Sequence, residues 1–254
     1  MGERERMVAA LRRSGSVFAE DELTELHRAA PDEAALAAMV ARRAAGEPIE
    51  QIVGTAAFAG LRIRVRPGVF VPRRRTELLA TIVADALAGL PRGARLLDLG
   101  CGSGAIAALA MHRVPGLEVV AIDADPRAVD CARENLTAAR VVLADSPDAL
   151  DASARFDVVA ANLPYVPTRE LALMPRDARE HEPLLALDGG PDGLVPLRRL
   201  APSIAARLAP GGRVAVELAP QQVDAAAGIL RAVGLGGAEV REDDALGATV
   251  LVAR

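Results

Sequence analysis

The 254-residue chain contains no lysine, no tryptophan and only two cysteines. The absence of lysine excludes catalysis through a lysine Schiff base. Cys101 and Cys131 cannot form a disulfide framework or a four-ligand zinc site by themselves. The three histidines lie far apart in the sequence, which disfavours a histidine-rich metal centre. We therefore expect no metal ion at the functional site.

Long apolar runs are also missing. No stretch approaches the ~18 consecutive apolar residues of a membrane-spanning helix, and Met1 leads into a charged sequence rather than into the apolar segment of a secretory signal. The formal net charge of −4 provides no general positive field for a phosphate backbone. One tyrosine and four phenylalanines offer few surfaces on which bases could stack. We expect a cytoplasmic protein that neither contacts a membrane nor binds nucleic acid stably.

Residues 1–48 have the apolar spacing of short helices. Pro31 and the acidic pair after it predict the start of the third helix, and Gly46 before Pro48 predicts its end. Two strand-like runs follow, over residues 51–58 and 61–66, on either side of Ala59 and Gly60. The sequence therefore predicts a small helical bundle over residues 1–48 and a β-hairpin linker over residues 49–75.

From residue 76 to residue 254, strand-like runs alternate with helix-like ones, which is typical of an α/β domain with a parallel sheet covered by helices. The loop between the last two runs is too short for a crossover helix, so the sheet should end in an antiparallel pair. The predicted strands are Arg95–Leu99, Glu118–Ile122, Arg140–Leu143, Asp157–Ala161, Arg213–Leu218, Ala238–Val240 and Ala248–Val252.

A glycine-rich turn follows the first of these strands. Residues 98–104 read Asp-Leu-Gly-Cys-Gly-Ser-Gly, and such glycines let the backbone approach a ligand at a helix N-terminus. Asp123, at the end of the next strand, is placed to accept hydrogen bonds from both hydroxyls of a ribose. The GxGxG spacing favours a nucleoside-containing cofactor without a diphosphate over a dinucleotide or a purely structural turn. The candidate cofactor-binding residues are Asp98, Gly100, Cys101, Gly102, Ser103, Gly104 and Asp123.

Three further features allow two interpretations each. Asp145 follows the third strand, where it could reach an adenine amino group or simply cap the turn before Ser146. Cys101 is interpreted as a small residue in a tight turn rather than as a reactive thiol. The arginine run over residues 73–75 could be a solvated face or could meet an acidic or RNA-bearing partner.

The fourth strand ends in Asn162-Leu163-Pro164-Tyr165, which includes the only tyrosine of the chain. This position lies at the mouth where open α/β sheets bind ligands. An amide or exocyclic amine nitrogen is a poor nucleophile, and two acceptors that hold its two N–H groups would orient its lone pair. Asn162 Oδ1 and the Leu163 carbonyl can supply those acceptors, Pro164 stiffens the turn, and Tyr165 offers a face to the planar group. The alternative is an Asx turn followed by proline.

These motifs resemble a known family. Asp98–Gly104 together with Asp123 looks like the S-adenosylmethionine site of class I methyltransferases. Asn162–Tyr165 resembles the Asn-Pro-Pro-Tyr motif of enzymes that methylate amide or amine nitrogen. More specifically, over about residues 40–254 the chain resembles the HemK/PrmC protein-glutamine methyltransferases. Further matching segments are Gly46–Pro48, Gly54–Phe58, Pro67–Arg73, Glu182–Pro183, Gly189–Leu194 and Pro210–Gly212 with Glu217.

The resemblance implies a Rossmann-like, seven-stranded class I methyltransferase domain behind the helical bundle and hairpin. It implies S-adenosylmethionine as cofactor, held by the glycine turn, Asp123, Asp145 and Asn162. It also implies that Asn162, Leu163, Pro164 and Tyr165 act on the acceptor. That acceptor would be the glutamine of the Gly-Gly-Gln loop in a peptide chain release factor. N-methylation of a nucleic-acid base or of a small molecule is the alternative.

The chain departs from the family pattern in three places. The usual Arg-Pro-Glu-Thr-Glu reads Arg-Arg-Arg-Thr-Glu over residues 73–77. Leu163 replaces the first proline of the tetrapeptide but retains the backbone carbonyl. The N-terminal bundle is also short. These differences suggest a divergent branch of the family.

Overall fold

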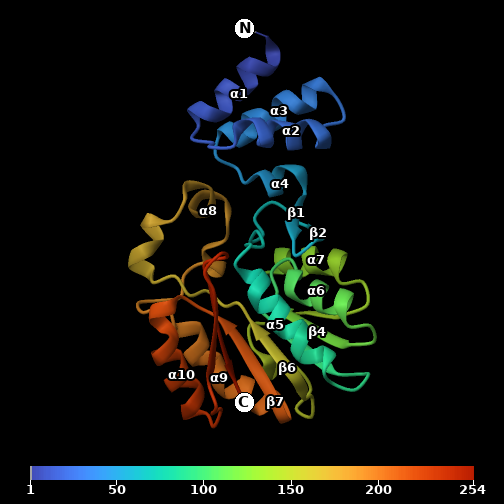
Figure 1. Ribbon diagram of the computed structural model, residues 1–254, viewed down its shortest axis with the longest axis vertical. Helices are drawn as coiled ribbons and strands as arrows, with labels where there is room; N and C mark the ends of the chain where they lie inside the picture. Colours follow the sequence, from blue (N-terminus) through green and yellow to red (C-terminus); the bar gives the residue numbers. More distant parts are fainter. Residues whose placement is uncertain (1) are drawn as a thin grey trace.

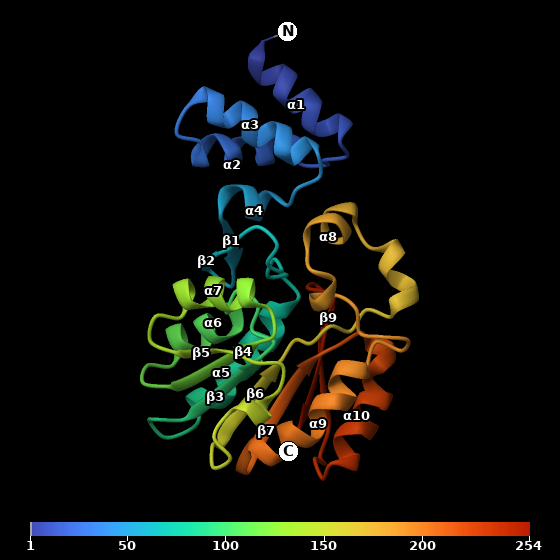
Figure 2. The ribbon, with the colours of Figure 1, turned by 180° about the vertical axis from the view of Figure 1, so that it is seen from behind.

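The computed structural model describes residues 2–254 and is elongated, with a small helical part at one end and an α/β domain at the other (Figure 1). A short connecting region with a hairpin lies between them, and both views show the same arrangement (Figure 2). None of the helices among these residues is long and apolar enough to span a membrane.

The helical part consists of α1 (Glu3–Arg13), α2 (Ala19–Ala29) and α3 (Glu33–Ala44). The predicted start of the third helix is confirmed, because Asp32 caps it by accepting a hydrogen bond from the Ala35 N–H at 2.8 Å. Apolar side chains at helical spacing meet in a small core of their own, which gains Ile52 from the connecting region. This core consists of Val8, Leu11, Ala19, Leu23, Leu26, Leu36, Val40 and Ile52.

The connecting region corrects one prediction. The run over residues 51–58 is not one strand, because its first part belongs to helix α4 (Ile49–Val53). Pro48 precedes this helix and Gly54 ends it in the left-handed conformation, with φ of 77°. The buried Gln51 side chain donates to the Val69 carbonyl at 2.9 Å, so the helical conformation is held by a distant loop. Strands β1 (Thr55–Phe58) and β2 (Leu61–Arg64) form the predicted antiparallel hairpin.

The α/β domain is built on one sheet. Within residues 2–254 this sheet has seven strands in the order β5-β4-β3-β6-β7-β9-β8, and β9 runs antiparallel to both of its neighbours. The predicted parallel sheet with an antiparallel end is therefore confirmed. The strands are β3 (Arg95–Leu99), β4 (Glu118–Asp123), β5 (Arg140–Leu143), β6 (Phe156–Ala161), β7 (Leu208–Glu217), β8 (Glu239–Asp243) and β9 (Ala248–Ala253).

Helices cover both faces of this sheet (Figures 1 and 2). The side chains of Leu79 on α5 and Leu109 on α6 pack on one face, and those of Ile204 on α9 and Leu230 on α10 pack on the other. These two apolar layers fix the ends of the strands, where the candidate site lies. The longer helices are α5 (Thr76–Ala88), α6 (Ala105–Arg113), α7 (Pro126–Asn135), α9 (Val195–Arg207) and α10 (Val223–Ala232), with the shorter α8 (Arg176–His181) after β6.

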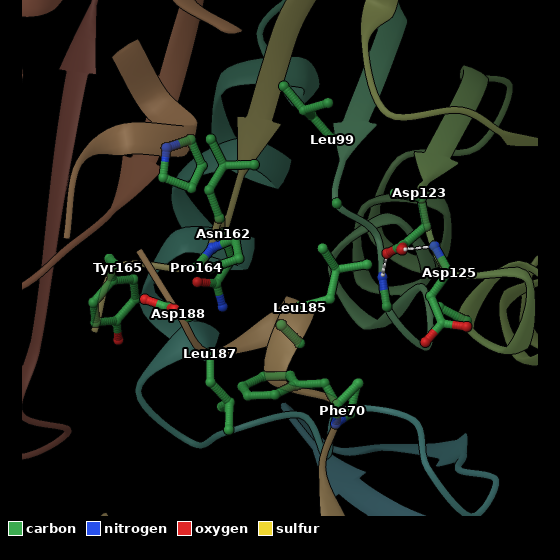
Figure 3. Close-up of a pocket in the computed structure, with 18 of the residues that line it drawn as sticks. Phe70, Leu99, Asp123, Asp125, Asn162, Pro164, Tyr165, Leu185, Leu187 and Asp188 are labelled. Atoms are coloured by element: carbon green, nitrogen blue, oxygen red, sulfur yellow. Dashed lines mark hydrogen bonds between the residues drawn. The ribbon is translucent and has the colours of Figure 1, made fainter. Parts of the chain in front are cut away.

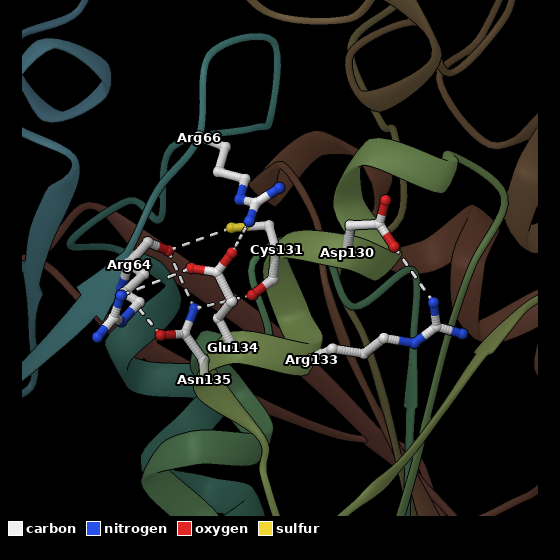
Figure 4. A network of polar contacts seen from close by, with 7 residues as sticks. All are labelled: Arg64, Arg66, Asp130, Cys131, Arg133, Glu134 and Asn135. Atoms are coloured by element: carbon white, nitrogen blue, oxygen red, sulfur yellow. Dashed lines mark hydrogen bonds and ion pairs between the residues drawn. The ribbon is translucent and has the colours of Figure 1, made fainter.

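The hairpin is attached to α7 by a polar network (Figure 4). The Asn135 side chain accepts from the Arg64 N–H at 2.9 Å and donates to the Arg64 carbonyl at 3.0 Å. The same amide nitrogen donates to the carbonyl of Ser103 at 2.8 Å. Glu134 forms an ion pair with Arg66. One asparagine thus joins the linker to the glycine-rich turn.

Candidate active site

The carboxyl ends of β3, β4 and β6 open into a cavity of about 230 Å³ (Figure 3). Gly100 and Gly102 after β3 and Asp123 at the end of β4 line one part of it. Asn162 and Tyr165 after β6 line another part. Parallel strands bring these loops to one edge of the sheet, as the sequence pattern predicted. The cavity therefore joins the candidate cofactor motif to the candidate acceptor motif.

The glycine turn brings the backbone close to a neighbouring loop. Gly100 has φ of 70°, and a Cβ placed on it would lie 3.5 Å from Leu163 Cδ2. Gly104 begins α6 in the left-handed conformation, and a Cβ there would lie 2.8 Å from Leu136 Cδ1. A side chain at either position would strain the backbone, and at Gly104 it would also displace Leu136. The turn consequently leaves backbone rather than side chains at this end of the cavity.

Asp123 holds the turn and also faces the cavity. Its two carboxylate oxygens accept from the Gly102 N–H at 2.8 Å and from the Asp125 N–H at 2.9 Å (Figure 3). Burial raises the pKa of this carboxyl. Each oxygen of a carboxylate can accept more than one hydrogen bond, so both retain capacity for a ligand hydroxyl. Two carboxylate oxygens that can still accept hydrogen bonds fit the two hydroxyls of a ribose in a nucleoside cofactor.

The other residues predicted in the turn lie behind this surface. Asp98, Cys101, Ser103 and Gly104 do not line the cavity that the structure describes. Asp98 is fully buried and accepts from the Ala107 N–H at 3.1 Å, and burial raises its pKa to about 7. Burial also raises the pKa of the Cys101 thiol, which agrees with a structural role rather than a reactive one. These residues shape the turn.

Asp145 lies on the rim of the cavity. Its carboxylate is largely exposed and forms an ion pair with Arg199 at 3.0 Å. Arg199 also donates to the Asp145 carbonyl at 3.0 Å. The carboxylate is near the cavity, as a residue contacting adenine would need to be, but it already has a cationic partner.

Asn162 presents a defined side-chain amide to the cavity. Its Nδ2 donates to the hydroxyl of Thr76 at 3.2 Å, so Oδ1 remains as the acceptor of this amide. Leu163 also lines the cavity, and its side chain packs in the apolar layer with Leu99. Pro164 and Tyr165 complete the wall beside Asn162 (Figure 3). The four residues of the tetrapeptide therefore all line one cavity.

Known proteins with similar sequences share one enzyme name. The chain is 40% identical over 209 residues to the release factor glutamine methyltransferase of Geobacter sulfurreducens. The aligned region covers 80% of this chain and 72% of the relative. It is 44% identical over 197 residues to the enzyme of that name from Mycolicibacterium smegmatis. This aligned region covers 74% of this chain and 68% of the relative. The chain belongs to the release factor glutamine methyltransferase family.

The family model of the methyltransferase small domain matches residues 60–176, from the hairpin to the start of α8. Among solved structures, the ribosomal protein L11 methylase of Lactobacillus delbrueckii subsp. bulgaricus is similar, with a TM-score of 0.55 at 18% sequence identity. The match covers 76% of this chain and 84% of that structure. The fold is that of the class I S-adenosylmethionine-dependent methyltransferases, as the resemblance implied.

The arginine run that departs from the family pattern is not a solvated face. Arg73 donates to the buried Glu182 carboxylate at 2.6 Å, and its guanidinium lies 5.0 Å from the centroid of the Phe70 ring. Arg75 donates to the buried Glu217 carboxylate at 3.3 Å. Arg74, by contrast, is an exposed residue. Two of the three arginines therefore neutralise buried acids at the wall of the cavity, which neither interpretation of the run included.

The structure adds a residue that no local pattern singled out. Gln222 is buried and donates to the carbonyls of Tyr165 at 2.9 Å and Asp192 at 3.1 Å. A Cβ on Gly193 would lie 2.2 Å from that amide nitrogen, so glycine is required for this contact. Gln222 thus fixes the backbone of the tetrapeptide from a short 3-10 helix after β7, Pro220–Gln222. The conspicuous glycines around residue 193 are the only local signal of it.

Proposed function

We propose that this chain methylates the side-chain amide nitrogen of a glutamine in a protein. The glutamine would be that of the Gly-Gly-Gln loop in a peptide chain release factor. The observation that carries the proposal is the position of Asn162. Its amide nitrogen is engaged by Thr76, so its oxygen is left to accept a hydrogen bond in the same cavity as the glycine turn. The names of the relatives support the choice of a release factor as acceptor.

S-adenosylmethionine would occupy the part of the cavity between the glycine turn and Asp123, and when bound it supplies a methyl group on a positively charged sulfur. Asp123 would accept hydrogen bonds from its ribose. Asp145 would hold its adenine amino group, in competition with Arg199. Gly100 and Gly102 would let it approach the backbone, while Asp98, Cys101, Ser103 and Gly104 keep the turn in shape.

The acceptor amide would be held by the tetrapeptide. Asn162 Oδ1 and the Leu163 carbonyl would accept its two N–H groups, and Tyr165 would pack against its plane. Fixing both N–H groups sets the direction of the nitrogen lone pair, and such orientation accounts for a large part of the rate of many transfer reactions. As the N–CH₃ bond forms, the S–CH₃ bond would break, S-adenosylhomocysteine would leave, and the amide nitrogen would lose a proton to solvent. No strong base is required before the new bond forms, because the amide nitrogen becomes acidic only as it is methylated.

The N-terminal segments would dock the protein acceptor. Helices α1 to α3 form a separate apolar core at the far end of the molecule from the sheet (Figure 1). The connecting region reaches from this core to the cavity, where Phe70, Arg73 and Arg75 line the wall. We propose residues 1–48 as a docking bundle, residues 49–75 as a linker, and residues 76–254 as the methyltransferase domain.

The experiment uses purified release factor, this protein, and S-adenosylmethionine with a trideuterated methyl group. We expect mass spectrometry to find the label on the glutamine of the Gly-Gly-Gln loop. Asn162→Ala should abolish the transfer but retain cofactor binding, measured by calorimetry, because its main role is to hold the acceptor.

Two results would contradict the proposal. Label found on a nucleic-acid base or a small amine, with none on the release factor, would assign a different acceptor. Loss of cofactor binding in a folded Asn162→Ala variant would make Asn162 a cofactor-binding or structural residue instead.

A further inference from the structure

Buried polar side chains group around Asn162 and the end of β7. Glu217, the last residue of β7, is 2% exposed, and its Oε1 accepts from the Tyr165 hydroxyl at 3.0 Å. Its Oε2 is buried and meets no donor with full hydrogen-bond geometry within residues 2–254. Thr76, at the start of α5, is 4% exposed and accepts the Asn162 amide at 3.2 Å. Burial raises the pKa of Glu217, and the neighbouring Thr76 hydroxyl offsets part of that rise.

The direction of these contacts follows from the available protons. A hydroxyl has one proton to donate and lone pairs to accept. Since the Thr76 oxygen accepts from Asn162, its proton is available to the unpaired carboxylate oxygen of Glu217. A carboxylate can only accept, so it cannot reverse this order.

We propose that Glu217 and Thr76 are positioning residues that fix the Asn162 amide with its oxygen, and not its nitrogen, facing the methyl acceptor. The inference rests on the proposed function, because it concerns how an amide acceptor is held. Neither residue touches the acceptor. Glu217 acts through the Thr76 hydroxyl on Asn162 and directly on the Tyr165 hydroxyl.

The orientation matters because the two ends of a side-chain amide have nearly the same shape but opposite hydrogen-bonding character. If Asn162 turned over, its NH₂ group would face the NH₂ group of the acceptor, and two donors would meet. Its oxygen would then face the Thr76 oxygen, whose proton is directed to Glu217. A buried polar pair without a proton between its members is costly. Thr76 and Glu217 therefore disfavour the orientation in which the Asn162 nitrogen faces the acceptor.

The kinetic test compares Thr76→Val, which keeps the side-chain shape but loses the hydroxyl, with Thr76→Ser, which restores it. We expect Thr76→Val to lower kcat by about tenfold, the effect of one lost hydrogen bond, and Thr76→Ser to recover most of that loss. KM for the intact release factor and Kd for the cofactor should stay nearly unchanged, because docking and cofactor binding use other residues. Thr249→Val, at another buried threonine, is the matched control and should leave kcat unchanged.

A second readout does not depend on methyl transfer. The chain has two asparagines, Asn135 and Asn162, so asparagine-selective ¹⁵N labelling gives two side-chain NH₂ pairs in an NMR spectrum. Asn135 is the internal reference, because three backbone carbonyls hold its amide. Thr76→Val and Glu217→Gln should each shift and broaden the Asn162 pair while the Asn135 pair stays in place. Thr76→Ser should return the Asn162 pair to its original position.

The outcomes separate the two proposals. Unchanged Asn162 signals in Thr76→Val, or equal kcat values for Thr76→Val and the wild type, would overturn the positioning role. If Thr76→Val does not fold, Glu217→Gln decides by the same signals. If the wild type transfers no methyl group to a release factor, the proposed function fails, whereas the NMR comparison still decides whether Thr76 and Glu217 orient Asn162.

Discussion

Arg75 lies over the ring of Tyr165, with its guanidinium carbon 5.8 Å from the ring centroid. Both side chains donate to the same oxygen of Glu217, Arg75 at 3.3 Å and Tyr165 at 3.0 Å. The arginine thus supplies the positive charge that a buried carboxylate needs. Arg75 stands at the position where the resemblance places an acid.

Arg75→Ala should therefore destabilise the protein. Removing one partner of a buried pair is costly, but the Arg75 side chain is 41% exposed, so we expect the free energy of unfolding to fall by only about 1–2 kcal/mol. Urea denaturation measures this change. The matched control is Arg74→Ala, at an exposed neighbour, which should change stability by less than ~0.5 kcal/mol. Equal effects of the two substitutions would contradict the pairing.

Asp123→Ala should weaken S-adenosylmethionine binding. The loss should be roughly 1.5–3 kcal/mol, because hydrogen bonds to a charged acceptor disappear. The variant also leaves the N–H groups of Gly102 and Asp125 without their acceptor. The turn should therefore become less ordered, which also lowers cofactor affinity. Calorimetry on the purified protein gives the affinity, with Asp130→Ala on the exposed side of α7 as control. Tight binding of NAD in place of S-adenosylmethionine by the wild type would refute this use of the site.

Leu163→Pro tests whether the backbone carbonyl is what the acceptor needs. Proline keeps that carbonyl and fixes φ near −65°, so we expect kcat within about tenfold of the wild type. Stability should fall, because the Leu163 side chain is buried beside Gly100 and Leu99. An inactive variant that still binds the cofactor would mean that the leucine side chain shapes the acceptor pocket.

Asp98 should make stability depend on pH. Its pKa is about 7 in the folded protein, above the ordinary 3.8, so the folded state holds a proton that the unfolded chain releases between these values. The favourable contribution is complete below pH ~4 and is lost as the pH rises through ~7, by up to about 4 kcal/mol. Asp98→Asn should remove this contribution from urea-unfolding curves measured between those pH values. The same pH dependence in the variant would exclude Asp98 as its source.

Asn135→Ala should release the hairpin. The substitution leaves the backbone groups of Arg64 and the Ser103 carbonyl without their side-chain partner, and we expect a loss of about 2 kcal/mol in local stability. Hydrogen exchange of the Arg64 amide should become faster. Arg133→Ala removes an exposed pair with Asp130 (Figure 4) and a 3.4 Å hydrogen bond to the Val141 carbonyl, neither of which involves the hairpin, so that exchange rate should stay unchanged. Equal protection in both variants would disprove the attachment.

The sheet could be predicted because its strands are apolar runs bounded by turn residues. Two strands, Arg95–Leu99 and Arg140–Leu143, have the bounds that the sequence predicts. The prediction of one strand over residues 51–58 was wrong, because the first residues of this run can form either a helix or a strand. In the fold, Gln51 of the helix contacts Val69, 18 positions away. Short apolar runs do not reveal such tertiary contacts.

The motifs of the candidate site could be predicted from the sequence, but the distant residues that hydrogen-bond to them could not. Gly100, Gly102, Asp123 and the tetrapeptide stand in local patterns that have a chemical reason. Partners of the tetrapeptide come from elsewhere: Thr76 is 86 positions from Asn162, and Glu217 is 52 positions from Tyr165. No spacing rule in a single sequence connects residues at these separations, so only the folded chain brings them together.

Tyr165 is the only tyrosine of a chain that has no tryptophan. All absorption and fluorescence at wavelengths above the phenylalanine band therefore come from one ring, and this ring lies in the wall of the cavity. Its surroundings are the guanidinium of Arg75 and the carboxylate of Glu217. A ligand that moves either group would change the near-ultraviolet spectrum of the whole protein. The unmodified chain thus has a built-in optical reporter of occupancy beside Asn162.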